Sequence, residues 1–126
     1  MDGAHNEDGI RAFLESVQKD GHEGARSLLF SVVKDKDYEQ MAEELVGSGL
    51  FDRFAIAHMQ TGRAVALSRL EQLFAKFPHC QYELYDNVTA AFQGLLHSRK
   101  EGERIYAAGS LYLVGEIKEL LEHDKL

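Results

Sequence analysis

The chain has 126 residues, and its hydrophobic fraction of 44% is enough to form the core of a single domain over residues 1–126. The net charge of −7 argues against a nucleic-acid partner, and no stretch approaches the roughly 20 apolar residues of a membrane-spanning helix. The single cysteine, Cys80, excludes an internal disulfide and is typical of a reducing compartment, so we expect a cytoplasmic protein. Cys80 is interpreted as a packing residue, and the scattered histidines predict no metal site.

The first elements alternate between helical and strand patterns. Apolar residues at i, i+3, i+4 and i+7 from Ile10 predict a helix over residues 8–20. The apolar run RSLLFSVV predicts a buried strand over residues 26–33. A second helix is predicted over residues 37–49, where Asp37 has the spacing of a capping residue and glycines end the segment.

The same alternation continues to the last residues. Further strands are predicted over residues 52–59, 80–85 and 104–110. Further helices are predicted over residues 68–77, 86–100 and 111–123. Ser68 and Glu71 have the spacing of a capping box for the third helix, and Asn87 is the expected N-cap of the fourth.

A helix followed by four strand–helix units predicts an α/β fold that is Rossmann-like, with a mostly parallel sheet and helices on both faces. Ligands of such folds bind at the carboxyl ends of the strands. The opening stretch DGAHNEDG has the form of a further strand-to-helix junction without its strand. We therefore expect a sheet that lacks its first strand and a domain excised from a longer chain.

The polar residues of the opening stretch suit a nucleotide. Asp2 can accept from ribose hydroxyls, His5 can contact phosphate or donate a proton, and Asn6 precedes a helix whose free N–H groups attract anions. The alternative is a helix cap preceded by a turn glycine.

Three later junctions carry groups that suit an anionic ligand. Lys34 follows the first strand, although the neighbouring charges are also compatible with a solvated loop. Arg63 can bind a carboxylate or phosphate through two hydrogen bonds, or lie on the surface. Gly109 permits close backbone approach, and Ser110 can hold a carboxylate or simply cap a helix.

Four segments together resemble one family. DGAHNEDGIRAF, SVVKDKDYEQMAEEL, GRA and AAGSLYLVGEIKELL are similar to the C-terminal domain of folylpolyglutamate synthase and of the bifunctional dihydrofolate synthase/folylpolyglutamate synthase, relatives of the Mur ligases. The resemblance runs from residue 2 to about residue 121. It departs from the family pattern at Glu7, Gly62 and Ala108, where the family has proline, proline and threonine.

The resemblance implies an ATP-dependent ligase that adds L-glutamate to folate or folylpolyglutamate through an acyl phosphate. It implies that Asp2 and Asn6 contact the nucleotide, and that His5 is the catalytic residue between the ATP phosphates and the incoming glutamate. Expected glutamate-site residues are Lys34, Asp35, Arg63, Gly109 and Ser110.

The partner implied by the resemblance is an N-terminal P-loop domain that cradles ATP and holds Mg²⁺, within a monomeric enzyme. This sequence has no phosphate-cradling loop motif, so the chain alone is expected to be inactive. Two alternatives stay open: a Mur-type ligase domain for a peptidoglycan precursor, and a free-standing nucleotide-binding or small-molecule-binding module without catalysis.

Overall fold

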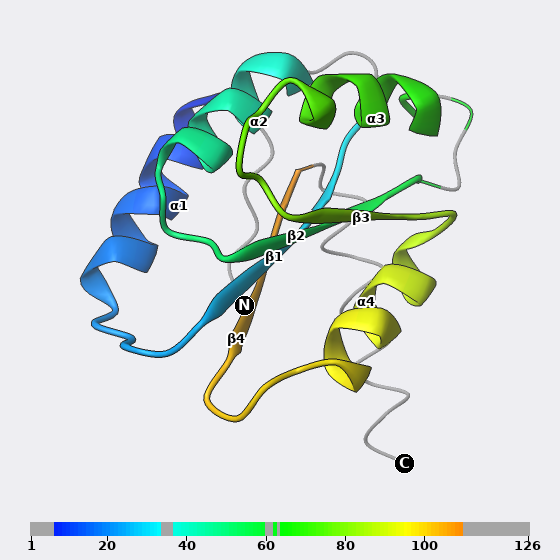
Figure 1. Cartoon of the computed structure of the whole chain (residues 1–126). Coiled ribbons are helices and arrows are strands. Elements are labelled where there is room, and N and C mark those ends of the chain that lie inside the picture. The colour runs from blue at the N-terminus through cyan, green and yellow to red at the C-terminus, as the bar shows by residue number, and fades with distance from the viewer. Residues whose placement is uncertain (1–6, 34–36, 60–61, 63, 110–126) are drawn as a thin grey trace.

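The computed structural model describes residues 7–33, 37–59, 62 and 64–109 (Figure 1). Within them the predicted order of helices and strands is confirmed, while the helix predicted over residues 111–123 lies outside the described residues. The elements are α1 (Glu7–Lys19), β1 (Arg26–Ser31), α2 (Tyr38–Gly47), β2 (Arg53–Ala57), α3 (Leu67–Ala75), β3 (Tyr82–Tyr85), α4 (Val88–His97) and β4 (Arg104–Gly109).

The described strands form one parallel sheet, as predicted, in the order β3-β2-β1-β4. The chain first steps outward from β1 through β2 to β3, and then returns to the other side of β1 to form β4. The crevice between β1 and β4 is therefore a topological switch point, the position at which open α/β sheets bind ligands.

Helices cover both faces of the sheet, which confirms the predicted layers (Figure 1). Alternate residues of β1 point to opposite faces, as the strand period of two requires. Leu28 and Phe30 pack in the cluster formed with α1, α2 and α3, whereas Leu29 packs in the cluster formed with α4. Among the described helices, none combines the length and the apolar character needed to cross a bilayer.

The two faces are packed differently. On the three-helix face, Phe74 of α3 is fully buried, and its ring centroid lies 5.7 to 5.9 Å from those of Phe30, Phe54, Phe77 and Tyr82. On the α4 face, strand residues such as Ala55, Ala57 and Ala107 are small.

Side-chain caps start two of the helices as predicted. The Asp37 side chain accepts a hydrogen bond from the Gln40 backbone N–H, and the Asn87 side chain accepts one from the Ala90 N–H at 2.7 Å. The capping box predicted for Ser68 is wrong, because α3 begins one residue earlier and its N-cap, Ala66, makes no side-chain cap bond. Val65 is buried in the core, so burial of the entering chain fixes this helix start.

Candidate functional site

The carboxyl ends of the four strands lie at one edge of the sheet. We call the described residues there the carboxyl edge: residues 31–33, from the last residue of β1 onward; residues 57–59, from the last residue of β2 onward; residue 86, after β3; and residue 109, the last of β4. A ligand of a parallel α/β sheet is expected at this edge, and above all at the β1/β4 switch point.

Gly109 lies directly at that switch point. It pairs with Ser31 in the β1–β4 ladder and has φ +134°, a conformation that residues with side chains rarely adopt. A Cβ atom at Gly109 would lie 1.8 Å from the Ser31 carbonyl oxygen. This close approach is made to the neighbouring strand of the same chain, which explains the glycine structurally. The predicted approach of Gly109 to a ligand stays a prediction.

Ser31 also joins β1 to β2. Its side chain is fully buried, and its Oγ donates to the Ala57 carbonyl oxygen at 2.5 Å. The regular β1–β2 register ends one residue earlier, at Phe30 and Ile56. The hydroxyl thus supplies a donor where the regular pairing of the two strands stops.

The connection between β2 and α3 returns to β1 beyond this point. An isolated antiparallel bridge joins Val33 to Ala64. The connection, residues 58–66, therefore starts next to the Ser31 hydrogen bond and comes back two residues further along β1. Both of its ends are attached to the carboxyl end of β1.

Most of the predicted site residues lie outside the described residues: Asp2, His5, Asn6, Lys34, Asp35, Arg63 and Ser110. Their grouping at the carboxyl edge stays a prediction. Their described neighbours do meet, since Val33 precedes Lys34, Ala64 follows Arg63, and these two neighbours are bridged. Gly109, which precedes Ser110, is paired with Ser31.

Sequence reasoning missed His58 as a candidate. It is half-buried at the carboxyl end of β2, and its backbone N–H donates to the Tyr85 carbonyl at 3.1 Å. The β2–β3 register, which pairs Ala57 with Tyr85, places the following residues, His58 and Asp86, beside each other. The available signal was its position near the carboxyl end of the strand predicted over residues 52–59, where ligands of such folds bind.

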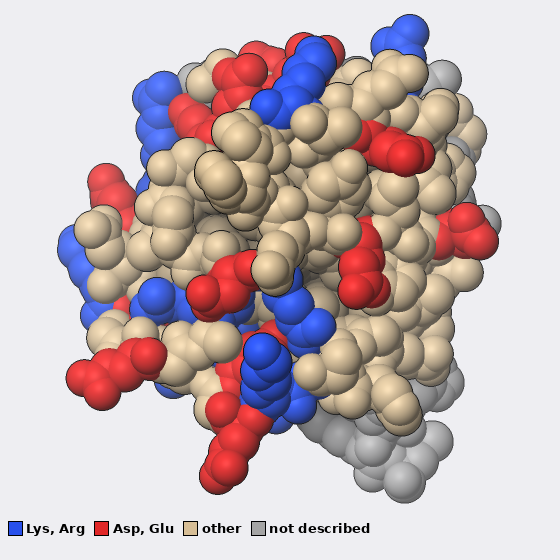
Figure 2. Space-filling view, in the orientation of Figure 1, with Lys and Arg blue, Asp and Glu red and all other residues tan. Residues whose placement is uncertain are grey.

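A pocket of about 540 Å³ lies at the opposite, amino end of the sheet, between β3 and α4. On the face of the molecule seen in Figure 2, acidic and basic side chains are intermixed. The pocket is lined by Arg53 and Glu103 among others, and these two charges already pair with each other.

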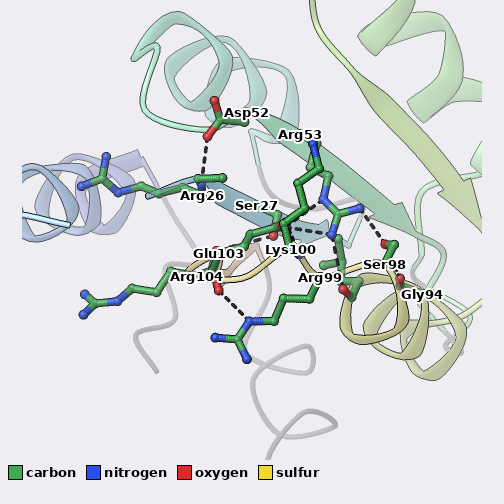
Figure 3. A network of polar contacts seen from close by, with 12 residues as sticks. Arg26, Ser27, Asp52, Arg53, Gly94, Ser98, Arg99, Lys100, Glu103 and Arg104 are labelled. Carbon is green, nitrogen blue, oxygen red and sulfur yellow. Dashed lines mark hydrogen bonds and ion pairs between the residues drawn. The ribbon is translucent and has the colours of Figure 1, made fainter. Parts of the chain in front are cut away.

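The guanidinium of Arg53 is occupied by the protein itself (Figure 3). Its Nε and Nη2 lie 2.9 and 2.8 Å from Oε2 of Glu103, its Nη1 donates to Ser98 Oγ at 2.7 Å, and Nη2 also donates to the Leu95 carbonyl at 3.3 Å. Glu103 is only 2% exposed. We interpret this end as a structural cluster, because its most buried charges, those of Arg53 and Glu103, already pair with each other.

Burial alone would raise the pKa of the Glu103 carboxyl. Hydrogen bonds from the Ser27 hydroxyl and the Lys100 backbone N–H, together with the guanidinium of Arg53, outweigh burial and lower the pKa below its ordinary value. Glu103 is therefore held ionised as the partner of Arg53.

A metal site and a reactive cysteine are two further kinds of site that the described part of the chain could contain. Residues 7–33, 37–59, 62 and 64–109 contain no cluster of three or more histidine, cysteine or acidic side chains that could hold a metal ion. Burial raises the pKa of the Cys80 thiol, which disfavours the reactive thiolate. This agrees with the interpretation of Cys80 as a packing residue.

Comparison with solved structures supports the fold. FolC from E. coli in complex with DHPP and ADP matches with a TM-score of 0.86 and 17% identity, over 100% of this chain and 29% of that one. Mycobacterium tuberculosis folylpolyglutamate synthase complexed with ADP matches with a TM-score of 0.84 and 19% identity, over 95% and 29% of the two chains. A bifunctional folylpolyglutamate synthase/dihydrofolate synthase with Mn, AMPPNP and L-glutamate bound matches with a TM-score of 0.79 and 18% identity, over 97% and 28%.

The chain thus spans less than a third of the length of these proteins, and at such identities the likeness concerns the fold. No curated protein matches the sequence. A family model described as Mur ligase, glutamate ligase domain, matches residues 1–111. The family predicted from the motifs is therefore confirmed, and the chain belongs to the glutamate ligase domain family of the Mur ligases.

Proposed function

We propose that this chain is the C-terminal domain of an ATP-dependent ligase that adds L-glutamate to folate or folylpolyglutamate. The observation that carries the proposal is the close approach of Gly109 to Ser31 at the β1/β4 switch point. Gly109 is the first residue of the family segment GSLYLVGE, and its pairing at the switch point supports a ligand site there, since this type of sheet binds ligands at that position.

The reaction has two steps. The terminal carboxylate of the folate substrate attacks the γ-phosphorus of ATP, which gives an acyl phosphate and releases ADP. The amine of L-glutamate then attacks the acyl carbon, and a tetrahedral intermediate collapses to the amide with loss of inorganic phosphate. In this scheme Asp2 and Asn6 bind the nucleotide, while His5 lies between the phosphates and the incoming amine.

The glutamate is proposed to bind through Lys34, Asp35, Arg63, Gly109 and Ser110. Lysine and arginine attract its carboxylates, and backbone N–H groups next to a glycine can approach them closely. The matched proteins contain ADP, AMPPNP, Mn, DHPP or L-glutamate according to the complex, which supports a nucleotide and an amino acid as ligands of this edge.

Magnesium is proposed to be held by a P-loop domain that this sequence does not contain. The described residues offer no acidic or histidine cluster for a metal ion, so no step is assigned to a metal here. The work of this chain is to bind and orient the nucleotide and glutamate. We place the ligase in the cytoplasm, as a monomer in which the P-loop domain is the partner of this domain.

The test measures ATP-dependent incorporation of labelled L-glutamate into tetrahydrofolate by the protein at its natural length. We expect incorporation that requires ATP, and none by the 126-residue chain alone. His5→Ala should lower turnover far more than it lowers the melting temperature. Equal losses of turnover and stability would contradict the catalytic role of His5.

Two other outcomes identify the alternatives. Activity with a peptidoglycan precursor, a UDP-sugar peptide, in place of folate would indicate a Mur-type ligase domain. Binding of ATP or glutamate without turnover by the protein at its natural length would indicate a binding module that has kept the fold and lost the chemistry. Two departures from the family pattern keep the second alternative open: Glu7 in place of proline, and Ala108 in place of the hydroxyl-bearing threonine.

A further inference from the structure

Ser31 is the residue at which three strand ends meet. On one side its backbone is in close contact with Gly109 of β4, and on the other its hydroxyl bonds to the Ala57 carbonyl of β2. Two residues later the same strand is bridged to Ala64. The carboxyl ends of β1, β2 and β4 are therefore joined through a few atoms around one fully buried serine.

The hydroxyl has a specific task in this arrangement. Regular pairing of β1 with β2 ends at Phe30 and Ile56, so the next carbonyl of β2, that of Ala57, receives its donor from the Ser31 side chain. The chain leaves β2 for the connection over residues 58–66 directly after this carbonyl. A buried carbonyl without a partner would shift to find one, and the start of the connection would move with it.

Ser27, on the same strand, provides an internal comparison. It is also fully buried, and its single hydroxyl hydrogen faces two acceptors, the Arg104 carbonyl at 3.5 Å and the Glu103 carboxylate, and can be donated to either. Ser27 thus makes a similar polar contact at the amino end of the sheet, away from the carboxyl edge. Ser31 makes its hydrogen bond at the carboxyl end of the sheet, whereas Ser27 makes its hydrogen bond at the amino end.

We propose that Ser31 is a positioning residue for glutamate binding, one that acts through the Ala57 carbonyl and Gly109 rather than by touching the ligand. This inference rests on the function proposed above for the carboxyl edge. The Ser31 hydroxyl holds the Ala57 carbonyl, after which the chain leaves β2. It therefore sets the distance between this point of the chain and the end of β4. Misplacement of binding groups by about 1 Å is enough to change rates by one or two orders of magnitude.

The experiment compares Ser31→Ala with Ser27→Ala in the protein at its natural length, using the glutamate incorporation assay. We expect Ser31→Ala to raise the KM for L-glutamate roughly tenfold, while the KM for ATP changes less than about twofold. Ser27→Ala should leave both KM values within about twofold, although it removes a buried hydroxyl too. Equal effects of the two substitutions on the KM for glutamate would overturn the proposal, as would no effect of Ser31→Ala.

A second variant covers the case in which Ser31→Ala does not fold. Ser31→Cys fills a similar space with a weaker donor, and we expect a smaller rise in the KM for glutamate than alanine would give. An unchanged KM for glutamate in a folded Ser31→Cys protein would overturn the proposal.

Amide hydrogen exchange separates this inference from the proposed function. If the unmodified protein transfers no glutamate, the proposed function fails, and the exchange rate at His58 then decides the role of Ser31. His58 is the residue that follows Ala57, and its N–H donates to the Tyr85 carbonyl. Exchange of this N–H therefore reports on the backbone next to the Ala57 carbonyl. Faster exchange at His58 in Ser31→Ala, but not in Ser27→Ala, supports positioning by the hydroxyl. Equal exchange in both variants overturns it.

Discussion

The substitution Gly109→Ala tests the geometry of the switch point most directly. The added Cβ would lie 1.8 Å from the carbonyl oxygen and 2.8 Å from the carbonyl carbon of Ser31. Both are backbone atoms in the middle of the sheet, so no side chain can turn away to make room. Either β1 or β4 must move by about 1 Å or more to reach an ordinary contact distance.

The loss in unfolding free energy expected for Gly109→Ala has two contributions. An alanine at φ +134° carries a conformational cost of about 1–3 kcal/mol. Moving the strands apart weakens buried ladder hydrogen bonds between β1 and β4, each of which contributes about 1 kcal/mol. The expected loss in unfolding free energy is about 3–5 kcal/mol, which corresponds to a decrease of roughly 10 °C or more in the melting temperature of a domain of this size.

Two glycines serve as controls in urea and thermal denaturation of the 126-residue chain. Gly102 also has a positive φ, +79°, but a Cβ there would meet nothing within 4 Å, so Gly102→Ala isolates the conformational cost at about 1 kcal/mol. Gly47, in α2, has open space as well, and Gly47→Ala should be neutral or stabilising. If Gly109→Ala is no less stable than Gly102→Ala, the close approach to Ser31 is refuted.

Four other substitutions, one of them a control, test the rest of the fold. Asn87→Ala should cost about 1 kcal/mol by removing the cap of α4, whereas Ser68→Ala, inside α3, should cost only a few tenths; equal losses in urea denaturation would contradict the assigned helix starts. Phe74→Ala should lower the unfolding free energy by about 3–5 kcal/mol, because it removes the most connected ring of the core, and a loss below about 1 kcal/mol would contradict that packing. Hydrogen bonds from the Tyr106 hydroxyl, the His22 N–H and Arg26 hold the pKa of Asp20 well below its ordinary value, so its ionised form stabilises the fold above about pH 4, and this contribution is lost as the pH falls through the lowered pKa. Asp20→Asn should therefore have a lower urea midpoint than the unmodified chain at pH 7, with a smaller difference at pH 3; a difference that grows on acidification would contradict the role of the carboxylate.

Much of the fold could be predicted from local patterns in the sequence. Helical and strand periodicities identified each described element, and the alternation of the two predicted a parallel sheet with helices on both faces. The start of α3 could not be predicted in this way, because a serine with a glutamate three residues later looks like a capping box wherever it occurs. The core position of Val65, which fixes the actual start, depends on contacts made by the folded chain.

In the candidate site, too, residues with a local sequence signal could be predicted, and residues that depend on contacts of the folded chain could not. Gly109 could be found because a glycine at the end of a predicted strand is unusual and local. Ser31 could not, because a serine in an apolar strand is interpreted as an ordinary strand residue, and its hydroxyl bonds to a residue 26 positions away. The residue-by-residue roles of Asp2, His5 and the other motif residues came from resemblance to a family, and they stay predictions.

Among the described residues, the contacts that join the strands differ in chemistry between the two ends of the sheet. At the amino end β1, β2 and β4 each begin with an arginine, and Arg26 lies directly opposite Arg104 in the ladder. These like charges would repel each other, but Asp20 lies 2.9 Å from the guanidinium of Arg26 and 3.4 Å from that of Arg104, while the third arginine is paired with a buried glutamate.

Around Ser31, in contrast, the described carboxyl ends of β1, β2 and β4 are joined by uncharged groups: the Ser31 hydroxyl, the Ala57 carbonyl and the backbone of Gly109. Paired charges at this edge would compete with an incoming nucleotide or amino acid for the same hydrogen bonds, because each ion pair uses the donors and acceptors that a charged ligand needs. An uncharged joint holds three strand ends in place without offering such a competitor. Among the described residues, the ion pairs of the three strand-initial arginines thus lie at the amino end, and the joint around Ser31 is made without charge.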